Sequence, residues 1–476
     1  MDLTQLWRLP ATRLAAGYRA GSFSPADVVR ACLQRMAQCE PLLHAMVCVD
    51  AAGALAAAEA SAARWRGGTP AGPLDGVPFT VKDNLHAAGL PTRWGSLLLR
   101  DAPQPQDEAP VRRLREAGAI LLGKTNLPPF ALQGFTASAM GGRTRNPRAP
   151  ALTPGGSSGG AAASVAAGYA PLAVATDGGG SIRRPAAYCG VLGYKPSEGL
   201  VPRAGGLPDL FDGHEVVGGF TRSLADLRLL TEALAGRSLP PPAASGAARI
   251  LFLPRLGARP VDRGIADAVR GLAHRLREQG HQVTEGEGAL TAWAERVHAL
   301  WPRLGAAGLA WMFEQAGRWP ALFGEAEGDG SMGMAAACDE ATRSLYLEGR
   351  GMPAASLYEL ADAVAELRHT LAALFAGYDY LLTPATSARA WPVESPCADA
   401  IDGQSAGPRS DAVFTPFANA AGLCALSLPC RLVEGLPVSC QLVAPQGEDA
   451  RLLAFAGPLA GFADGLPLAE PETATP

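Results

Sequence analysis

Two serines, a lysine and a run of glycines could together carry out acyl transfer. Ser181 follows Gly178-Gly179-Gly180, and three glycines let the backbone turn so tightly that several N–H groups can face one point. Converging amides beside a serine hydroxyl suit this chemistry, because the tetrahedral intermediate places negative charge on the former carbonyl oxygen. We therefore predict Ser181 as the nucleophile and Gly178, Gly179 and Gly180 as the residues that bind the oxyanion.

Ser157 and Lys82 supply groups that could carry away the proton of the nucleophile. Ser157 lies in a second glycine-serine cluster, residues 155–160, which precedes a run of alanine and other small residues. Lys82 follows the apolar stretch 77–81, which predicts a buried strand. A lysine can accept a proton only when burial has lowered its pKa from about 10.4 toward neutrality. We therefore expect Lys82 to be buried and to make polar contacts with Ser157.

The three segments resemble the signature of the amidase signature family of serine hydrolases. They are Gly-Gly-Ser-Ser-Gly-Gly around Ser157, Thr-Asp-Gly-Gly-Gly-Ser-Ile-Arg-Arg-Pro around Ser181, and Gly-Val-Pro-Phe-Thr-Val-Lys-Asp-Asn around Lys82. The resemblance extends over about residues 20–236 and 355–455. It implies a Ser-cisSer-Lys triad of Ser181, Ser157 and Lys82 that needs no metal and no organic cofactor.

Helices and strands are expected to alternate along most of the chain. Ser24 before Pro25 is typical of a helix start, and Ser223 is expected to cap a later helix. We predict helices over 24–39, 51–66, 108–117, 161–170, 224–235, 263–279 and 354–376, and strands over 77–81, 119–122, 171–176, 249–253, 378–383, 425–428 and 437–443. This order predicts an α/β fold. The resemblance implies one fold, with a large mixed sheet covered by helices on both faces.

The expected organisation has three parts. Residues 1–65 form an N-terminal helical segment that packs on the core, residues 66–462 the amidase signature domain, and residues 463–476 a C-terminal tail. The domain holds a catalytic core over about 70–236 and a variable substrate-pocket region over about 285–350, which is rich in tryptophan, phenylalanine and methionine. Some of these side chains are interpreted as the wall of an acyl pocket, with ordinary helix packing as the alternative. The substrate-binding residues stay unassigned.

Composition narrows the range of partners. The chain has 476 residues, 41 Lys plus Arg against 45 Asp plus Glu, and this near balance gives no reason to expect nucleic acid or an anionic membrane as partner. The nine cysteines contain no CxxC pair and are interpreted as reduced core residues, and no run of about 18 apolar residues occurs. We expect a cytoplasmic protein with a small-molecule amide substrate and leave a homodimer open.

Two other motifs match known patterns, but their surroundings do not fit. Residues 118–125 match the phosphate-binding loop G-x-x-x-x-G-K-T, yet the inner residues are apolar enough to be a strand and Pro128-Pro129 follows. Residues 155–159 match the nucleophile elbow G-x-S-x-G, yet residues 146–154 contain three prolines and cannot form the strand that an elbow requires. An elbow-type α/β-hydrolase is kept as a minor alternative.

The predicted function is hydrolysis of a small carboxylic amide to a carboxylate and ammonia or an amine through a Ser181 acyl-enzyme. The alternative is a glutaminase subunit of a transamidosome-type amidotransferase, which shares the motifs. Three departures count against this alternative. Such subunits share an acidic residue where this chain has Pro128-Pro129, and an arginine where it has Leu200. They also share an aspartate where this chain has Ala412, with Asp411 one position away. A non-catalytic binding protein of the same fold is the third interpretation.

Overall fold

The apolar runs of the sequence form one mixed sheet. The computed structural model describes residues 2–241, 246–286, 289–323 and 330–471. Within them the main sheet has eleven strands in the order β1-β3-β2-β6-β8-β7-β14-β15-β11-β9-β10. In that order they are β1 (Met46–Val49), β3 (Ile120–Thr125), β2 (Pro78–Lys82), β6 (Leu172–Asp177), β8 (Val216–Thr221), β7 (Leu192–Lys195), β14 (Cys424–Val433), β15 (Leu436–Ala444), β11 (Tyr380–Pro384), β9 (Arg249–Phe252) and β10 (Gln282–Glu285). Two small hairpins are separate from it, β4 (Ala137–Ser138) with β5 (Gly142–Arg143) and β12 (Ala400–Ile401) with β13 (Gln404–Ser405).

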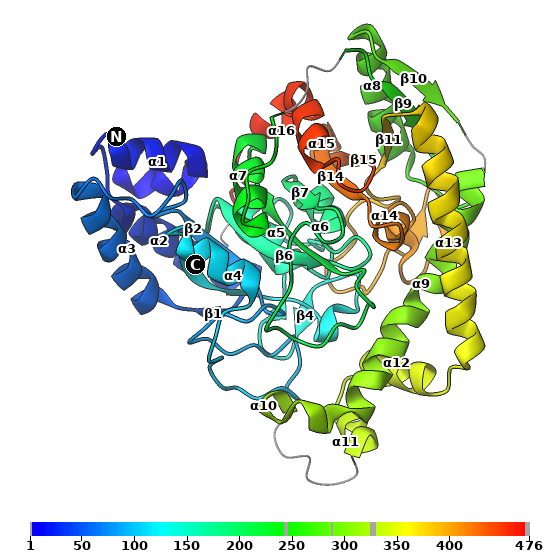
Figure 1. The fold of residues 1–476 in the computed structure, drawn as a ribbon, viewed down its shortest axis with the longest axis horizontal. Helices are drawn as coiled ribbons and strands as arrows, with labels where there is room; N and C mark the ends of the chain where they lie inside the picture. The colour runs from blue at the N-terminus through cyan, green and yellow to red at the C-terminus, as the bar shows by residue number, and fades with distance from the viewer. Residues whose placement is uncertain (1, 242–245, 287–288, 324–329, 472–476) are drawn as a thin grey trace.

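Helices surround this sheet, and a long pair extends away from it on the side of β9 and β11 (Figure 1). The long pair is α9 (Ala289–Glu314) and α13 (Ala354–Gly377). The other helices are α1 (Ala11–Arg19), α2 (Pro25–Leu43), α3 (Ala51–Arg66), α4 (Ala109–Glu116), α5 (Gly159–Ala166), α6 (Arg183–Cys189), α7 (Leu224–Ala235), α8 (Arg263–Glu278), α10 (Pro320–Phe323), α11 (Gly330–Ala336), α12 (Glu340–Arg350), α14 (Pro416–Ala420), α15 (Asp449–Phe455) and α16 (Gly461–Asp464). The predicted α/β class and mixed sheet are therefore confirmed.

The position of the site follows from two neighbouring parallel strands. β2 lies between β3 and β6 and is parallel to both, and all of its residues are buried. A strand covered on both faces reads as a continuous apolar run, which is why 77–81 could be predicted. Because β2 and β6 run in the same direction, Lys82 at the end of one lies near the loop that follows Asp177 at the end of the other.

Small residues let α5 approach the sheet closely. A Cβ atom at Gly160 would lie 2.6 Å from the Asn126 nitrogen and 2.6 Å from the Ala45 oxygen, so only glycine fits there. Every residue of the helix is buried. The glycine-serine cluster that precedes α5 is therefore held against the ends of β2 and β6, with Ser158 at the N-cap position.

The N-terminal segment differs from the prediction of a helical segment. It contains the expected helices α2 and α3, with Ser24 in a capping box, but also β1, which pairs antiparallel with β3 at the edge of the main sheet. Its short run of four residues, 46–49, carried little pattern by which to recognise a strand. The Pro/Ala/Ser-rich stretch 240–248, whose composition is typical of a linker, lies partly outside the described residues, which omit 242–245. None of the described helices combines the length and apolar character needed to cross a membrane.

Candidate active site

Lys82 is fully buried and contacts two hydroxyl groups. Its Nζ lies 2.8 Å from Ser157 Oγ and 3.1 Å from Thr176 Oγ1. Asn84 Nδ2 also donates to Thr176 Oγ1, at 2.9 Å, which fixes that hydroxyl. Burial lowers the pKa of Lys82 to about 7, although the more distant charges of Glu215 and Asp177 oppose this shift. Lys82 is thus a lysine that exchanges a proton near neutral pH, in contact with Ser157.

The segment that carries Ser157 lies against the segment that carries Ser181. The backbone N–H of Ser158 donates to the Ser181 carbonyl at 3.3 Å, and Ser158 Oγ donates to the Thr176 carbonyl at 3.1 Å. The peptide bond between Gly156 and Ser157 is cis. Ser157 is fully buried, whereas Ser181 keeps 8% of its surface exposed. The structure therefore brings the three predicted residues to one place, and of the three only Ser181 keeps some of its surface exposed.

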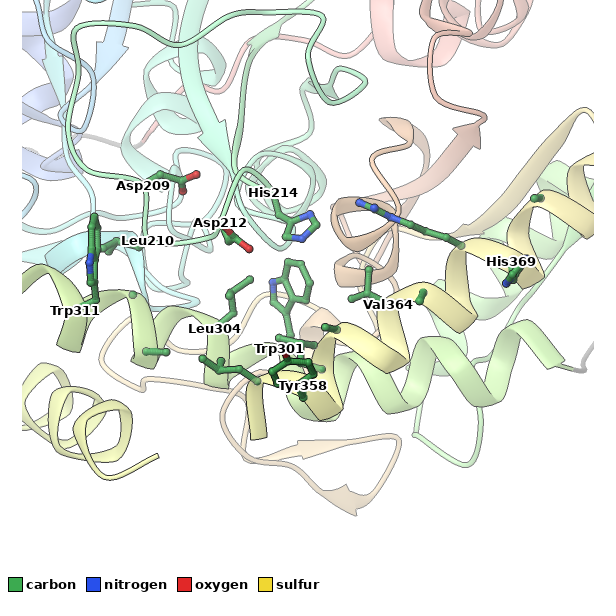
Figure 2. Close-up of a pocket in the computed structure, with 18 residues that line it drawn as sticks. Asp209, Leu210, Asp212, His214, Trp301, Leu304, Trp311, Tyr358, Val364 and His369 are labelled. Atoms are coloured by element: carbon green, nitrogen blue, oxygen red, sulfur yellow. The ribbon is translucent and has the colours of Figure 1, made fainter. Parts of the chain in front are cut away.

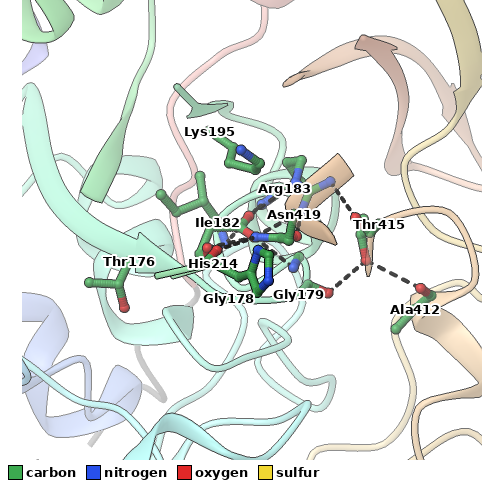
Figure 3. Close-up of polar contacts among 12 residues, drawn as sticks. Thr176, Gly178, Gly179, Ile182, Arg183, Lys195, His214, Ala412, Thr415 and Asn419 are labelled. Atoms are coloured by element: carbon green, nitrogen blue, oxygen red, sulfur yellow. Dashed lines mark hydrogen bonds and ion pairs between the residues drawn. The ribbon is translucent and has the colours of Figure 1, made fainter. Parts of the chain in front are cut away.

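Asp177 and Arg183 hold the glycine loop in shape. Arg183 Nη2 and Nε donate to the two Asp177 carboxylate oxygens at 2.8 Å and 3.0 Å, and Gly180 N donates to Asp177 Oδ1 at 2.7 Å. Burial alone would raise the pKa of Asp177, but the charge and hydrogen bonds of Arg183 outweigh it and hold that pKa below its ordinary value. Figure 3 shows Arg183 and Asn419 converging on this loop. Asp177 therefore stays ionised, as a support of the loop.

The carbonyls of the loop are fixed from outside by two residues that sequence reasoning did not assign. Trp301 Nε1 donates to the Gly178 carbonyl at 2.8 Å. Thr415 Oγ1 donates to the Gly179 carbonyl, also at 2.8 Å, and Figure 3 shows this second contact. Thr415 lies within residues 355–455, over which the resemblance extends, and Trp301 lies in the aromatic-rich region, but neither position indicates this contact. Each bond fixes one peptide plane and so the direction of the N–H at its other end.

The N–H groups of this loop do not all have the same use. Gly180 N is taken by Asp177. Within the described residues, the N–H groups of Gly178, Gly179 and Ser181 donate to no protein acceptor. Unpaired N–H groups at a buried site are rare and suit a bound acceptor. The amides available to an oxyanion are therefore those of Gly178, Gly179 and Ser181. The N–H of Gly180, which was predicted to bind the oxyanion, instead holds the loop to Asp177.

A groove of about 1070 Å³ is lined in part by Trp301, the residue that donates to the Gly178 carbonyl of the loop. Its walls are formed by α9, α13 and the segment 209–214, and Figure 2 shows His214 directly opposite the Trp301 ring. The two ring centres are 5.4 Å apart. Ser181, Ser157 and Lys82 are not among the residues that line the groove, so it adjoins the triad through Trp301 and does not contain it.

The aromatic-rich region is divided between groove and core. Trp301 and Trp311 line the groove, while Met312 and Phe313 are buried in a cluster with Phe130. Ordinary helix packing therefore accounts for part of this region, and another part lines the groove; the acyl-pocket interpretation stays a prediction.

The phosphate-loop match at 118–125 and the elbow match at 155–159 do not form the structures that those motifs require. Lys124 of the phosphate-loop match lies within β3 and is fully buried, with its Nζ 2.9 Å from Asp83 Oδ1, so the segment forms no loop. The residues just before Ser157 belong to no strand, so an elbow is absent from this described segment. Across the described ranges, no group of three or more His, Cys, Asp or Glu side chains is placed to hold a metal ion.

Residues 27–453 match the family described as Amidase. The chain belongs to the amidase family. It is 34% identical to a glutamyl-tRNA(Gln) amidotransferase subunit from Symbiobacterium thermophilum, over 94% of this chain and 95% of that one, and 36% identical to the corresponding protein from Thermus thermophilus, over 93% and 95%. Among solved amidase structures it resembles the peptide amidase of Stenotrophomonas maltophilia, with a TM-score of 0.79, 29% identity and coverage of 98% of this chain and 99% of that one. It also resembles a bacterial aryl acylamidase of the amidase signature family, with a TM-score of 0.82, 26% identity and coverage of 97% of this chain and 99% of that one. The resemblance noted in the sequence is thus confirmed, and with it the amidase fold.

Proposed function

We propose that this chain hydrolyses primary carboxylic amides and releases ammonia, with Ser181 as nucleophile, Ser157 as proton relay and Lys82 as base. The observation that carries the proposal is the 2.8 Å contact between Lys82 Nζ and Ser157 Oγ in a fully buried setting beside Ser181. Burial lowers the pKa of Lys82 to about 7, so a large share of the enzyme holds a neutral amine at neutral pH. A neutral amine has the lone pair that a general base needs.

The proposed reaction proceeds in two halves. Ser181 Oγ forms a bond to the amide carbon while its proton passes through Ser157 to Lys82 Nζ, and the carbonyl oxygen takes up the negative charge. The N–H groups of Gly178, Gly179 and Ser181 stabilise this oxyanion, and loss of one such donor can cost about 3 kcal/mol. The C–N bond then breaks, Lys82 returns the proton to the leaving nitrogen, and ammonia departs. Water attacks the acyl-enzyme by the same proton route and releases the carboxylate.

Glutamine is the amide to test first. The two relatives from Symbiobacterium and Thermus are subunits of a glutamyl-tRNA(Gln) amidotransferase, and they favour a glutaminase subunit over a free-standing amidase. The residues that depart from that type nevertheless sit in the structure with other partners. Asp411, one place from the expected aspartate, is bound by Arg184 at 2.9 Å and by the Tyr188 hydroxyl at 3.0 Å. The solved amidases named above support the free-standing enzyme as the second candidate.

A substrate panel separates these functions. Purified protein is given glutamine, simple primary amides, anilides and ureas, and the release of ammonia or amine is measured with and without the other subunits of a glutamyl-tRNA amidotransferase. Glutamine turnover that requires those added proteins supports the glutaminase. Turnover of simple amides by the chain alone supports the amidase. No turnover of any compound, and no covalent labelling of Ser181, would refute both and leave a binding protein.

The shape of the glycine loop can be tested by a matched pair of alanine variants. Gly180 has a φ of 112°, and a Cβ atom there would lie 2.3 Å from Thr415 Oγ1. Gly213 also has a positive φ, 84°, but nothing lies within 4 Å of its Cβ position. We expect Gly180→Ala to lower kcat at least ~10-fold, because the oxyanion amides move, and Gly213→Ala to leave kcat within a factor of about 2. Equal effects of the two variants would contradict a catalytic role for the loop.

A further inference from the structure

A cationic side chain with no ion-pair partner lies beside the glycine loop. Arg409 precedes the short 3-10 helix η4 (Ser410–Ala412), and its backbone has a φ of 65°. A Cβ atom at Gly179 would lie 3.7 Å from Arg409 Nη2, which places the guanidinium against the loop that we assign to the oxyanion. Within the described residues, the guanidinium forms no salt bridge, and its buried Nε has no hydrogen-bond partner.

The surroundings of Arg409 are short of negative charge. The charge of Asp411 acts on Arg409, but this carboxylate is already held by Arg184 and Tyr188. His298 lies in the same cluster, and burial lowers its pKa to about 3, so its ring adds no charge at neutral pH. Within the described part of the chain, His298 Nδ1 and Arg184 Nε are also buried without a hydrogen-bond partner. Two guanidinium nitrogen atoms of one cluster, Arg409 Nε and Arg184 Nε, thus have no acceptor among the described residues.

Arg409 is half-buried, and its Nε is buried without a hydrogen-bond partner among the described residues; such a partly enclosed guanidinium is costly, because charges in proteins are normally paired where water is excluded. Burial lowers the pKa of Arg409 to about 10, and the positive charge of Arg184 adds to this effect, so Arg409 is still a cation at neutral pH. The loop beside it would receive the reacting carbonyl of the substrate. A bound anion at this position would supply the missing counter-charge, and guanidinium matches a carboxylate in geometry.

We propose that Arg409 binds a carboxylate carried by the amide substrate, so that the enzyme prefers amides that bear a second, ionised carboxyl group. This inference rests on the proposed function, since it concerns the substrate of the same site. It applies to glutamine, which carries such a carboxylate, and equally to the monoamides of simple dicarboxylic acids. Arg409 is then a residue that determines specificity by direct contact with the substrate, while the proton transfers stay with Lys82 and Ser157.

The test compares substrates of matched shape. Glutaramate is paired with 5-methylhexanamide and succinamate with 4-methylpentanamide, because an isopropyl group replaces the carboxylate in each neutral partner. Ammonia release gives kcat/KM for each compound. We expect the unmodified protein to prefer the charged member of the better pair at least ~10-fold, as one charge-assisted hydrogen-bonded pair would provide. No preference for the charged member in either pair, together with measurable turnover, overturns the inference while the proposed function stands.

Variants locate the preference. Arg409→Met should remove it by lowering kcat/KM for the charged amides at least ~10-fold and leaving the neutral amides within a factor of about 3. Arg409→Lys, which keeps the charge but not the bidentate geometry, should retain part of it. Arg255→Met, which removes an exposed arginine, serves as the control for net charge and should change nothing. An equal loss on charged and neutral amides would refute substrate recognition and place Arg409 with the oxyanion or the fold.

Two control measurements separate a loss of substrate preference from a loss of folding or of the triad. Thermal melting and fluorophosphonate labelling of Ser181 report whether each variant is folded and has an intact triad. If Arg409→Met does not fold, Arg409→Lys decides, and an undiminished preference in that variant contradicts a bidentate contact. If the unmodified protein neither turns over any amide nor reacts with the label, the proposed function itself has failed, which is distinct from failure of the carboxylate preference.

Discussion

Lys82 allows the sharpest test of the proposed mechanism. Only the neutral amine can take the proton of Ser181 through Ser157, so kcat/KM should follow the fraction of unprotonated Lys82. With a pKa of about 7 that fraction is about a tenth at pH 6 and about nine-tenths at pH 8. We therefore expect kcat/KM to rise roughly tenfold for each pH unit well below 7 and to level off above about pH 8.

Two substitutions at this position separate a base from a structural charge. Lys82→Met, similar in length and uncharged, should lower kcat/KM at least ~10²-fold and flatten the rise with pH. Lys82→Arg should fail as well, because a guanidinium stays protonated at any usable pH. The assay is initial-rate ammonia release over about pH 5.5 to 9 in buffers of constant ionic strength, with Ser181 labelling as the check on folding.

Lys195 provides the matched control. It is a second fully buried lysine, and burial lowers its pKa to about 8, but its Nζ donates to the Pro196 carbonyl and touches none of the predicted triad. Lys195→Met should keep the rise of kcat/KM near pH 7. Near-normal activity of Lys82→Arg with an unchanged pH profile would refute the reasoning, because the proton acceptor would then have to be another group.

Three further outcomes are expected. Fluorophosphonate should label Ser181 alone, and mass spectrometry that finds the label on Ser157 would disprove the assignment of the nucleophile. Lys82→Met should also have a larger free energy of unfolding than the unmodified protein at pH 7, by the order of a few kcal/mol, because the folded state lowers the lysine pKa from 10.5 to about 7. Urea titrations should show this difference shrinking as the pH rises from about 7 to about 10.5, where the unfolded lysine also loses its proton. A difference that stays constant with pH would contradict burial of Lys82 as its cause. Arg183→Met should lower the free energy of unfolding by roughly 3–5 kcal/mol, since it leaves the buried Asp177 carboxylate unpaired. Arg270→Met breaks an exposed ion pair and should lower it by at most about 1 kcal/mol. Similar denaturation midpoints for the two variants would contradict a role of Arg183 in holding the glycine loop.

The sequence by itself determined the local elements and the chemistry-bearing residues. Helix 51–66 was predicted with the bounds that the structure has, and Ser223 caps α7 as expected, because capping and apolar spacing act within a few residues. The end of β2 at Lys82 could be predicted as well, because the run before it is largely apolar, as expected of a strand buried on both faces. Ser157, Ser181 and the glycines could be predicted as site residues because nucleophile chemistry limits the residue types and spacing.

Only the tertiary structure decided which distant groups meet around those residues. Trp301 and Thr415 reach the glycine loop from more than 100 positions away, and no local pattern encodes a contact between a side chain and a remote carbonyl. The use of Gly180 N by Asp177 depends on the turn that the folded loop adopts. Arg409 is one arginine among many in the sequence. It becomes distinctive only when the fold places its guanidinium beside Gly179 and pairs Asp411 with Arg184, because proximity and pairing are properties of the whole chain packed together.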